Sequence, residues 1–412
     1  MSKYLVTGGA GFIGSHLVDK RLTYAYKQGM GMSSPVTFEI QKRSGTSRAR
    51  LGRLVTPHGV VETPTLVPVA TQATIKTLWS EQVLQTKTQL LIANTFHLHL
   101  KPGATIIKKA GGLHKFMNWS APLMTDSAGY QVFSLGFGKD HALGKVLKQP
   151  SDRSVEVNDE PREIKITDRG VTFRSPVNGD KIFIGPQESM QIQSDLGADI
   201  IYAFDECTPP NASHDYTKAS LERTHRWAQQ SLAAHDPKQA LFGVVQGGRF
   251  QDLRRESART IGGMDFDGFG IGGEFGADKS AMAGMIRWVV RELPDDRPRH
   301  LLGIGHIEDI RPIIEEGIDT FDCIAPTHYA RHGMAFTRTD RINLRQSKYL
   351  HDLGPLDAGC TCFVCANYTR AYLSHLFKAH EITALSLTSF HNLHLINTYV
   401  AELRQEIRAG RL

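Results

Sequence analysis

Three cysteines near the C-terminal end of the chain form a candidate metal site. The segment GCTCFVC places Cys360, Cys362 and Cys365 within six residues. Three thiolates and one imidazole complete the tetrahedral shell of a closed zinc site, which leaves no coordination position for a substrate. We therefore expect a structural Zn²⁺ rather than a catalytic one. Three histidines follow, and spacing does not choose among them: His380, His391 and His394.

Three carboxylates follow or end short apolar runs. Asp126 lies in TDSAGYQVFSLG, Asp205 in FDEC and Asp322 in FDCIAP. A carboxylate that faces a cleft but is backed by apolar strands can have a raised pKa while its neighbour stays ionised. Acid, base or nucleophilic roles are therefore possible. The alternative is that some of these residues only cap the helix that follows.

The first residues carry a glycine pattern typical of dinucleotide-binding enzymes. LVTGGAGFIGSHLVD, with Gly8, Gly11 and Gly14, resembles the first turn of the short-chain dehydrogenase/epimerase family. Such a site needs an acidic residue roughly 20 positions further on, to bind the ribose. After Asp19 the next acidic residue is Glu39, and no second strand is evident. We interpret residues 1–31 as an extension without function and do not expect NAD to bind.

A basic loop follows the third carboxylate. THYARHG (327–333) and TRTDRINLRQSKY (337–349) place several cations beside Asp322. Cations there would suit a phosphodiester backbone, although a solvated surface face is the simpler alternative. The net charge of +6 favours a polyanionic partner only weakly.

The elements that position these residues alternate between two types. Apolar runs that end in a polar or glycine residue predict buried parallel strands, and amphipathic stretches such as 216–235 and 279–293 predict the helices between them. This repetition favours a (β/α)8 barrel over a doubly wound open sheet. The apolar runs lie at 121–129, 198–207, 240–248, 266–274, 300–306 and 318–326. The charged segment from about 136 to 165 reads as a surface insertion.

Active sites of parallel barrels and sheets collect at the carboxyl ends of the strands. The residues that fall there are Asp126, Asp205, Gln246, Gly272, Gly273 and Asp322. The overall composition, with 41% hydrophobic and 22% charged residues, is that of an ordinary globular protein. No apolar run approaches the roughly 20 residues of a membrane-spanning helix, and no signal-peptide layout is present. We expect a cytoplasmic protein with no membrane partner.

Several long motifs together resemble bacterial-type tRNA-guanine transglycosylases, over residues from about 36 to 412. They are GRLVTPHGVVETPTLVPVAT, ANTFHLHLKPG, TDSAGYQVFSLG, FDECTPP, VVQGG, the tail of GFGIGG, FDCIAPT with ARHG, and the CxCxxC…His site. The resemblance implies an irregular (β/α)8 TIM-type barrel over 32–412. It also implies a zinc-binding subdomain at about 340–395 and a homodimer that acts on the tRNA anticodon loop.

The family is made up of pentosyltransferases of the queuosine pathway. They replace guanine at the wobble position of GUN-anticodon tRNAs by a 7-deazaguanine, and the bacterial type implies preQ1. By resemblance, Asp322 is the nucleophile that forms a covalent adduct with the ribose. Asp126 is the general acid/base, supported by Asn94.

The same resemblance implies roles for the remaining site residues. Asp205, Gln246 and the backbone at Gly272 and Gly273 would read the base. Ser127 and Tyr130 would line the pocket, and Thr327, His328 and Arg331 would contact RNA. The zinc ligands would be Cys360, Cys362, Cys365 and His391.

Three departures from the family pattern affect these expectations. GGEFGAD (272–278) replaces the usual GGLAVGE, which bears on the identity of the inserted base. His328 replaces an arginine and Ala128 replaces a glycine. The alternatives are insertion of queuine or another 7-deazaguanine, a non-catalytic zinc-containing RNA-binding protein and, more remotely, an NAD-dependent epimerase or reductase.

Overall fold

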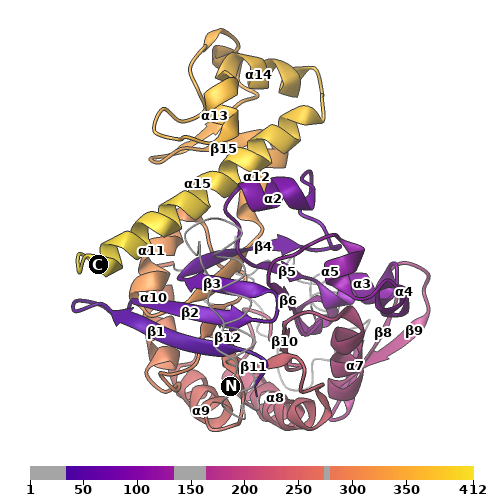
Figure 1. The fold of residues 1–412 in the computed structure, drawn as a ribbon. Coiled ribbons are helices and arrows are strands. Elements are labelled where there is room, and N and C mark those ends of the chain that lie inside the picture. The colour runs from indigo at the N-terminus through magenta and orange to yellow at the C-terminus, as the bar shows by residue number, and fades with distance from the viewer. Residues whose placement is uncertain (1–33, 134–163, 273–278) are drawn as a thin grey trace, which may run out of the picture.

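A closed barrel of parallel strands forms the centre of the structure (Figure 1). The structure is a computed structural model that describes residues 34–133, 164–272 and 279–412. Within these ranges the barrel strands, in spatial order, are β4 (Thr65–Ala70), β5 (Leu91–Ala93), β6 (Leu123–Thr125), β10 (Ile200–Tyr202), β11 (Ala240–Val245), β12 (Gly268–Ile271), β13 (Arg299–Leu301) and β14 (Thr320–Cys323). The expected (β/α)8 type of barrel is confirmed, and the open doubly wound sheet is excluded.

Helices surround the barrel and connect its strands (Figure 1). Two of them match the predicted helical stretches. The long helix α8 begins at His214 rather than near 216, because the Ser213 side chain accepts a hydrogen bond from the Tyr216 amide and caps it. Among the described residues, the connecting helices are α2 (Ser80–Gln85), α3 (Thr95–Leu100), α4 (Ala104–Lys109), α5 (Leu113–Phe116), α7 (Pro186–Leu196), α8 (His214–Ala234), α9 (Gln251–Gly262), α10 (Lys279–Val290) and α11 (Ile307–Glu315), and α12 (Ala325–Arg331) follows the last barrel strand.

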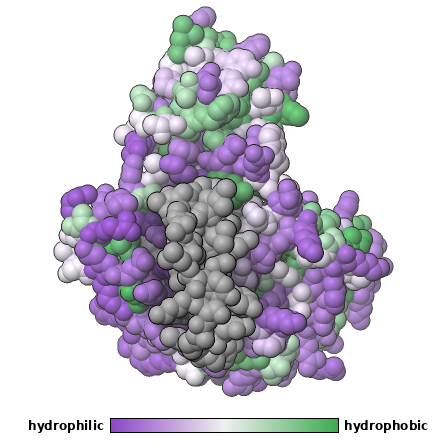
Figure 2. Space-filling view, viewed as in Figure 1, coloured by the Kyte–Doolittle hydropathy of each residue, from purple (hydrophilic) through white to green (hydrophobic). Residues whose placement is uncertain are grey.

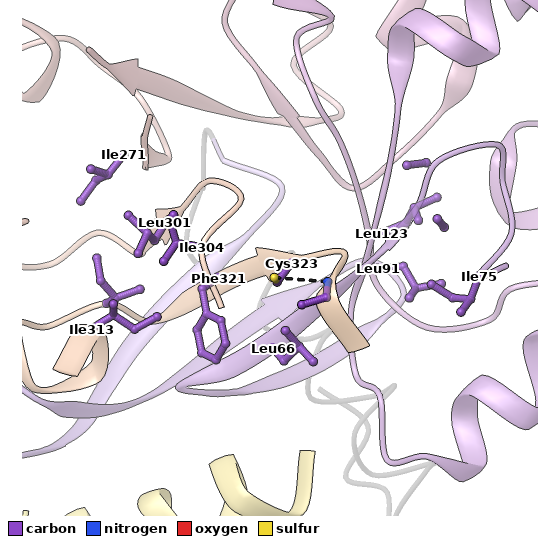
Figure 3. Close-up of a cluster of buried hydrophobic side chains, with 14 of the residues drawn as sticks. Leu66, Ile75, Leu91, Leu123, Ile271, Leu301, Ile304, Ile313, Phe321 and Cys323 are labelled. Carbon is purple, nitrogen blue, oxygen red and sulfur yellow. Dashed lines mark hydrogen bonds between the residues drawn. The ribbon is translucent and has the colours of Figure 1, made fainter. Parts of the chain in front are cut away.

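Alternation along the strands divides the core into two layers. Successive strand residues point to opposite faces, so one set packs outward against the helices. Figure 3 shows part of this outer layer, including Leu66, Leu91, Leu123, Leu301 and Phe321. The other set fills the barrel itself: Val67, Ile92, Met124, Ile200, Tyr202, Phe242 and Val244. The barrel interior is therefore a packed core that supports the strand ends.

Two antiparallel sheets supplement the barrel. The first consists of β1 (Thr37–Arg43), β2 (Arg50–Thr56) and β3 (Gly59–Thr63), and it leads directly into β4. Leu54 and Val61 from this sheet join the interior cluster, so it covers the end where the strands begin. The second consists of β7 (Ile164–Thr167), β8 (Gly170–Arg174) and β9 (Lys181–Ile184), between β6 and α7. The predicted insertion at 136–165 and the extension 1–31 fall almost entirely outside the described residues.

A small subdomain follows α12 and projects from the barrel (Figure 1). The final helix, α15 (Thr383–Arg408), runs from this subdomain back along the barrel, and the Asn392 side chain donates a hydrogen bond to the Pro326 carbonyl of α12. None of the helices in the described ranges is both long and apolar enough to cross a membrane. The other elements of the subdomain are β15 (Met334–Phe336), β16 (Arg341–Asn343), the 3-10 helix η1 (Ser347–His351), α13 (Phe363–Asn367) and α14 (Arg370–Lys378).

Candidate active site and metal centre

Asp126 directly follows β6 and is held by donors from the end of β5. Its Oδ1 accepts a hydrogen bond from the Thr95 amide at 2.8 Å, and its Oδ2 accepts one from Asn94 Nδ2 at 2.6 Å. Asn94 is itself fixed, because its side-chain oxygen accepts from the His97 amide and caps α3. The predicted support of Asp126 by Asn94 is therefore present as a direct contact.

The pKa of Asp126 is raised to about 7. Desolvation of the carboxyl group is the main cause, and the negative charge of Asp322 adds to it. Hydrogen bonds from Thr95, Ala128 and Gln131 act in the opposite direction. A carboxyl group with a pKa near neutrality can both give and take a proton at physiological pH.

Asp205 follows β10 and forms a second polar group with two neighbours. Its Oδ1 accepts from the Ser127 hydroxyl at 2.7 Å, and its Oδ2 accepts from Gln246 Nε2 at 2.6 Å. All three side chains are buried. Gly129 allows this approach, because a Cβ at that position would lie 2.4 Å from the Asp205 carbonyl oxygen. The fold thus brings the strand ends of β6, β10 and β11 together.

The end of β12 completes this group. Gly272 donates its amide to the Val245 carbonyl at 3.0 Å, and a Cβ there would lie 2.9 Å from Gln246 Nε2. Arg254 of α9, which is fully buried, donates to the Gly272 carbonyl at 3.2 Å and also to the Gly248 carbonyl. One guanidinium therefore fixes the loops after β11 and β12. The predicted residue Gly273 lies outside the described residues.

Asp322 lies on β14, with its side chain 14% exposed. Its Oδ1 accepts from the Gly303 amide at 2.6 Å and lies 3.2 Å from His300 Nε2. The charges of Asp322 and Asp126 both raise the pKa of Tyr202, a buried barrel residue, although burial is the larger cause. Asp322 also raises the pKa of Asp126. The two carboxylates therefore act on one shared region of the barrel.

The remaining predicted residues lie around this region. Tyr130 is half-buried and lies at the start of a helical segment shortly after Asp126. On α12, His328 is exposed and Arg331 is half-buried, with its Nε donating to the Thr327 carbonyl at 3.2 Å. Thr327 is 8% exposed, so its side chain offers little surface to an RNA.

The three cysteines converge with one histidine. Cys360, Cys362, Cys365 and His391 each direct a ligand atom into a group whose atoms lie within 4.8 Å of one another, and the five cysteines, all among the described residues, form no disulfide bond. The distances from His391 Nδ1 to the three sulfurs are 3.8, 3.5 and 3.3 Å. His394 approaches only Cys360, at 3.9 Å, and His380 is exposed. His391 is therefore the histidine of this group.

The donor set suits a soft, tetrahedral metal ion. His391 Nε2 donates to the Phe336 carbonyl at 2.8 Å, which places the proton on Nε2 and leaves the Nδ1 lone pair facing the thiols. Three sulfurs and one nitrogen are the usual ligands of a closed structural site. The residues of the cluster lie after the last barrel strand in the chain, whereas the three aspartates lie on or directly after barrel strands.

The structure adds site residues that sequence reasoning missed. They are Thr95 and Gln131 on Asp126, Arg254 behind Gly272, and His300 with Gly303 on Asp322. His300 lies opposite Thr320 in the paired strands, and alternation along β14 places Thr320 and Asp322 on the same face of the barrel as His300. The register itself could not be read from the sequence.

Comparison with known proteins identifies the family. A family model described as queuine tRNA-ribosyltransferase matches residues 44–412. The chain belongs to this family. A putative queuine tRNA-ribosyltransferase of Archaeoglobus fulgidus is 44% identical over 393 residues, covering 91% of this chain and 97% of the relative. Queuine tRNA-ribosyltransferases of Desulforamulus reducens and Staphylococcus aureus strain JH9 are 44% and 45% identical over 380 residues, covering 92% of this chain and 96% and 94% of theirs.

Membership in the queuine tRNA-ribosyltransferase family confirms the predicted relation to tRNA-guanine transglycosylases, which are pentosyltransferases. The match begins at residue 44, after the opening glycine motif. Residues 44–412, which carry the candidate site, therefore give no support to the alternative of an NAD-dependent epimerase or reductase.

Proposed function

We propose that this protein exchanges guanine at the wobble position of GUN-anticodon tRNAs for a 7-deazaguanine, preQ1, by double displacement. The observation that carries this proposal is the pairing of two aspartates with different environments. Asp126 has a pKa near 7, whereas Asp322 is held by two nitrogen atoms at one oxygen. One carboxyl group is thus suited to proton transfer and the other to bond formation.

In the first displacement, Asp322 attacks C1′ of the anticodon ribose. A bond forms between a carboxylate oxygen and C1′, the bond from C1′ to guanine N9 breaks, and Asp126 supplies the proton that neutralises the departing base. The product is a covalent ester between the tRNA and the enzyme. A nucleotide that is stacked in the anticodon loop must be extruded for this attack.

In the second displacement, the incoming base replaces the ester. Its N9 bonds to C1′, the ester bond breaks, and Asp126 takes the N9 proton. Asp322 returns as a carboxylate. Two inversions at C1′ give net retention, as in retaining glycosidases.

The buried group around Asp205 is suited to recognising the base. A guanine-like edge presents N–H donors and a carbonyl oxygen, which a carboxylate and an amide can match. Within the described residues, Gln246 Oε1 is buried and has no hydrogen-bond partner. An unpaired buried acceptor costs free energy until a ligand pairs with it, so Gln246 favours a base that carries N–H groups.

The other proposals concern the metal, the RNA and the assembly. We infer that the Cys₃His cluster binds a structural Zn²⁺ and that the exposed His328 and the half-buried Arg331 contact tRNA phosphates.

The subdomain exposes large apolar side chains, and Figure 2 shows hydrophobic residues gathered there. Such a surface supports a homodimer. The exposed residues are Leu353, Phe363, Tyr372 and Ile382. A tRNA substrate implies that the enzyme acts in the cytoplasm.

The experiment that tests the function is mass spectrometry of the wobble nucleoside. Guanine-bearing tRNA with a GUN anticodon is incubated with the protein in three separate reactions, which contain preQ1, preQ0 or queuine. We expect the preQ1 nucleoside to form, and Asp126→Asn to be the inactive control. Incorporation of a different base would correct the substrate, and incorporation of none would refute the exchange.

A further inference from the structure

A buried histidine contacts the proposed nucleophile inside the barrel. His300 on β13 has no exposed surface, and its Nε2 lies 3.2 Å from Asp322 Oδ1. Its other ring nitrogen, Nδ1, lies 2.8 Å from the Thr320 hydroxyl. His300 pairs with Thr320 across β13 and β14. Its ring therefore contacts its direct neighbour Thr320 through one nitrogen and Asp322, two positions further along β14, through the other.

The contacts determine where the ring proton lies. An ionised carboxylate only accepts hydrogen bonds, so Nε2 must carry a proton to bond with Asp322 Oδ1. In the neutral ring, Nδ1 then accepts from the Thr320 hydroxyl. The Gly303 amide is a second donor to the same oxygen, at 2.6 Å. Oδ1 of Asp322 is therefore held by a side chain and by the backbone.

We propose that His300 is a positioning residue for Asp322, an inference that rests on the proposed double displacement. By holding Oδ1, the ring of His300 and the Gly303 amide fix the carboxylate rotamer and assign bond formation with C1′ to Oδ2. His300 transfers no proton in either step. Its N–H stays on Nε2 throughout.

The second displacement depends on this donor more strongly than the first. In the covalent adduct Oδ2 is the ester oxygen and Oδ1 is the carbonyl oxygen. When the incoming N9 bonds to C1′, the Oδ2–C1′ bond breaks and negative charge returns to the carboxylate. A donor already aimed at Oδ1 stabilises that developing charge, as preorganised donors do at other reaction centres. In the first displacement the same donor orients the nucleophile, which speeds the attack on C1′, but it also stabilises the nucleophile's charge, which slows the attack. The two effects on the rate therefore partly cancel.

The matched variants are His300→Leu and His300→Gln. Leucine removes the donor and retains an apolar side chain, whereas the glutamine amide can place an N–H near the position of Nε2. The two half-reactions are followed separately in single-turnover experiments, with the adduct measured on denaturing gels.

For His300→Leu we expect release of the adduct by the incoming base to slow by about 10- to 100-fold, the loss of one hydrogen bond to a charged group. The adduct should accumulate at steady state, while the Kd for tRNA binding stays within about twofold, since binding contacts are unchanged. His300→Gln should restore most of the release rate. A folded His300→Leu protein with unchanged release, or equal loss in both variants, would overturn the proposal.

A measurement on the unaltered protein avoids any loss of folding in the variants. Nitrogen-15 NMR of labelled histidine rings should show His300 with a proton on Nε2, and a bare Nε2 would contradict the proposal. The measurements also distinguish an error in the proposed double displacement from an error in the proposed role of His300. If the unaltered protein forms no adduct, the double displacement is wrong, whereas a normal adduct with His300-independent release refutes only the role of His300.

Discussion

Asp322 raises the pKa of Asp126, although the two residues end different strands and accept from different donors. The consequence is a coupling between nucleophile and acid/base. While Asp322 is ionised, its charge favours the protonated form of Asp126, the form needed to protonate the departing base. Once Asp322 is an ester, that charge is gone and Asp126 more readily stays ionised, as the second step requires.

The two half-reactions should therefore have opposite pH dependences. Adduct formation needs protonated Asp126, so its rate should fall as pH rises through about 7, by tenfold for each further unit. Release of the adduct needs ionised Asp126, so its rate should rise with pH. The midpoint of this rise should lie below pH 7, and the rate should level off above that midpoint. Single-turnover rates measured from about pH 5 to about pH 9, roughly two units on either side of the Asp126 pKa, check this. Parallel profiles for both steps would remove Asp126 from proton transfer.

The base-recognition group should determine the affinity for the incoming base. In Gln246→Ala the contact to Asp205 is lost, and we expect the KM for the incoming base to rise by about 10-fold or more, the cost of one or two buried hydrogen bonds. Gln89→Ala is the matched control. Gln89 bonds to the Glu62 backbone near the start of β5, away from the strand ends that carry the aspartates. Equal KM changes in both variants would count against base recognition by Gln246.

The turn after Asp126 allows a test with two neighbouring small residues. In Gly129→Ala the new Cβ would lie 2.4 Å from the Asp205 carbonyl oxygen, so we expect a loss of about 1–3 kcal/mol in unfolding free energy together with reduced activity. Ala128 has a positive φ of 71°, a region in which a Cβ is strained. Ala128→Gly should therefore leave the protein as stable or slightly more stable. Thermal unfolding distinguishes the two, and a stable, active Gly129→Ala protein would show that the turn has other room to adjust.

The metal cluster should control the stability of the subdomain. Cys362 is buried, and Cys362→Ser should lose the metal and lower the melting temperature, because binding free energy of a structural zinc ion is folding free energy. Cys207→Ser is the control, since Cys207 is a half-buried cysteine that is in no disulfide bond and lies outside the cluster. Metal content and melting temperature are measured for both. A metal-free Cys362→Ser protein with normal melting and activity would rule out the structural role.

The sequence predicted those parts of the molecule whose position follows from residue type and local hydrophobic pattern alone. Asp126, Asp205 and Gln246 were located because polar residues after buried parallel strands share one edge of a barrel. Strands β4 and β5 were not predicted. The first lies in a motif rich in threonine, proline and valine, and the second is only three residues long, so neither shows a clear period.

Other features depend on tertiary contacts that no local pattern encodes. Spacing left three histidines open for the metal site, and the Phe336 carbonyl, 55 residues away in the chain, orients His391. His300 reads as the start of an apolar run, and only the register of β13 against β14 directs it to Asp322. Arg254 reads as one charge on an amphipathic helix, yet the fold buries it against two loop carbonyls.

The most direct test of the account is the covalent adduct itself. Unaltered protein and Asp322→Asn protein are each incubated with guanine-bearing tRNA, and a denaturing gel then separates free from protein-linked tRNA. We predict a denaturant-resistant adduct with the unaltered protein. With Asp322→Asn we predict neither adduct nor base exchange, while tRNA binding measured under native conditions persists. An adduct that survives in Asp322→Asn would place the nucleophile at another residue and contradict the account.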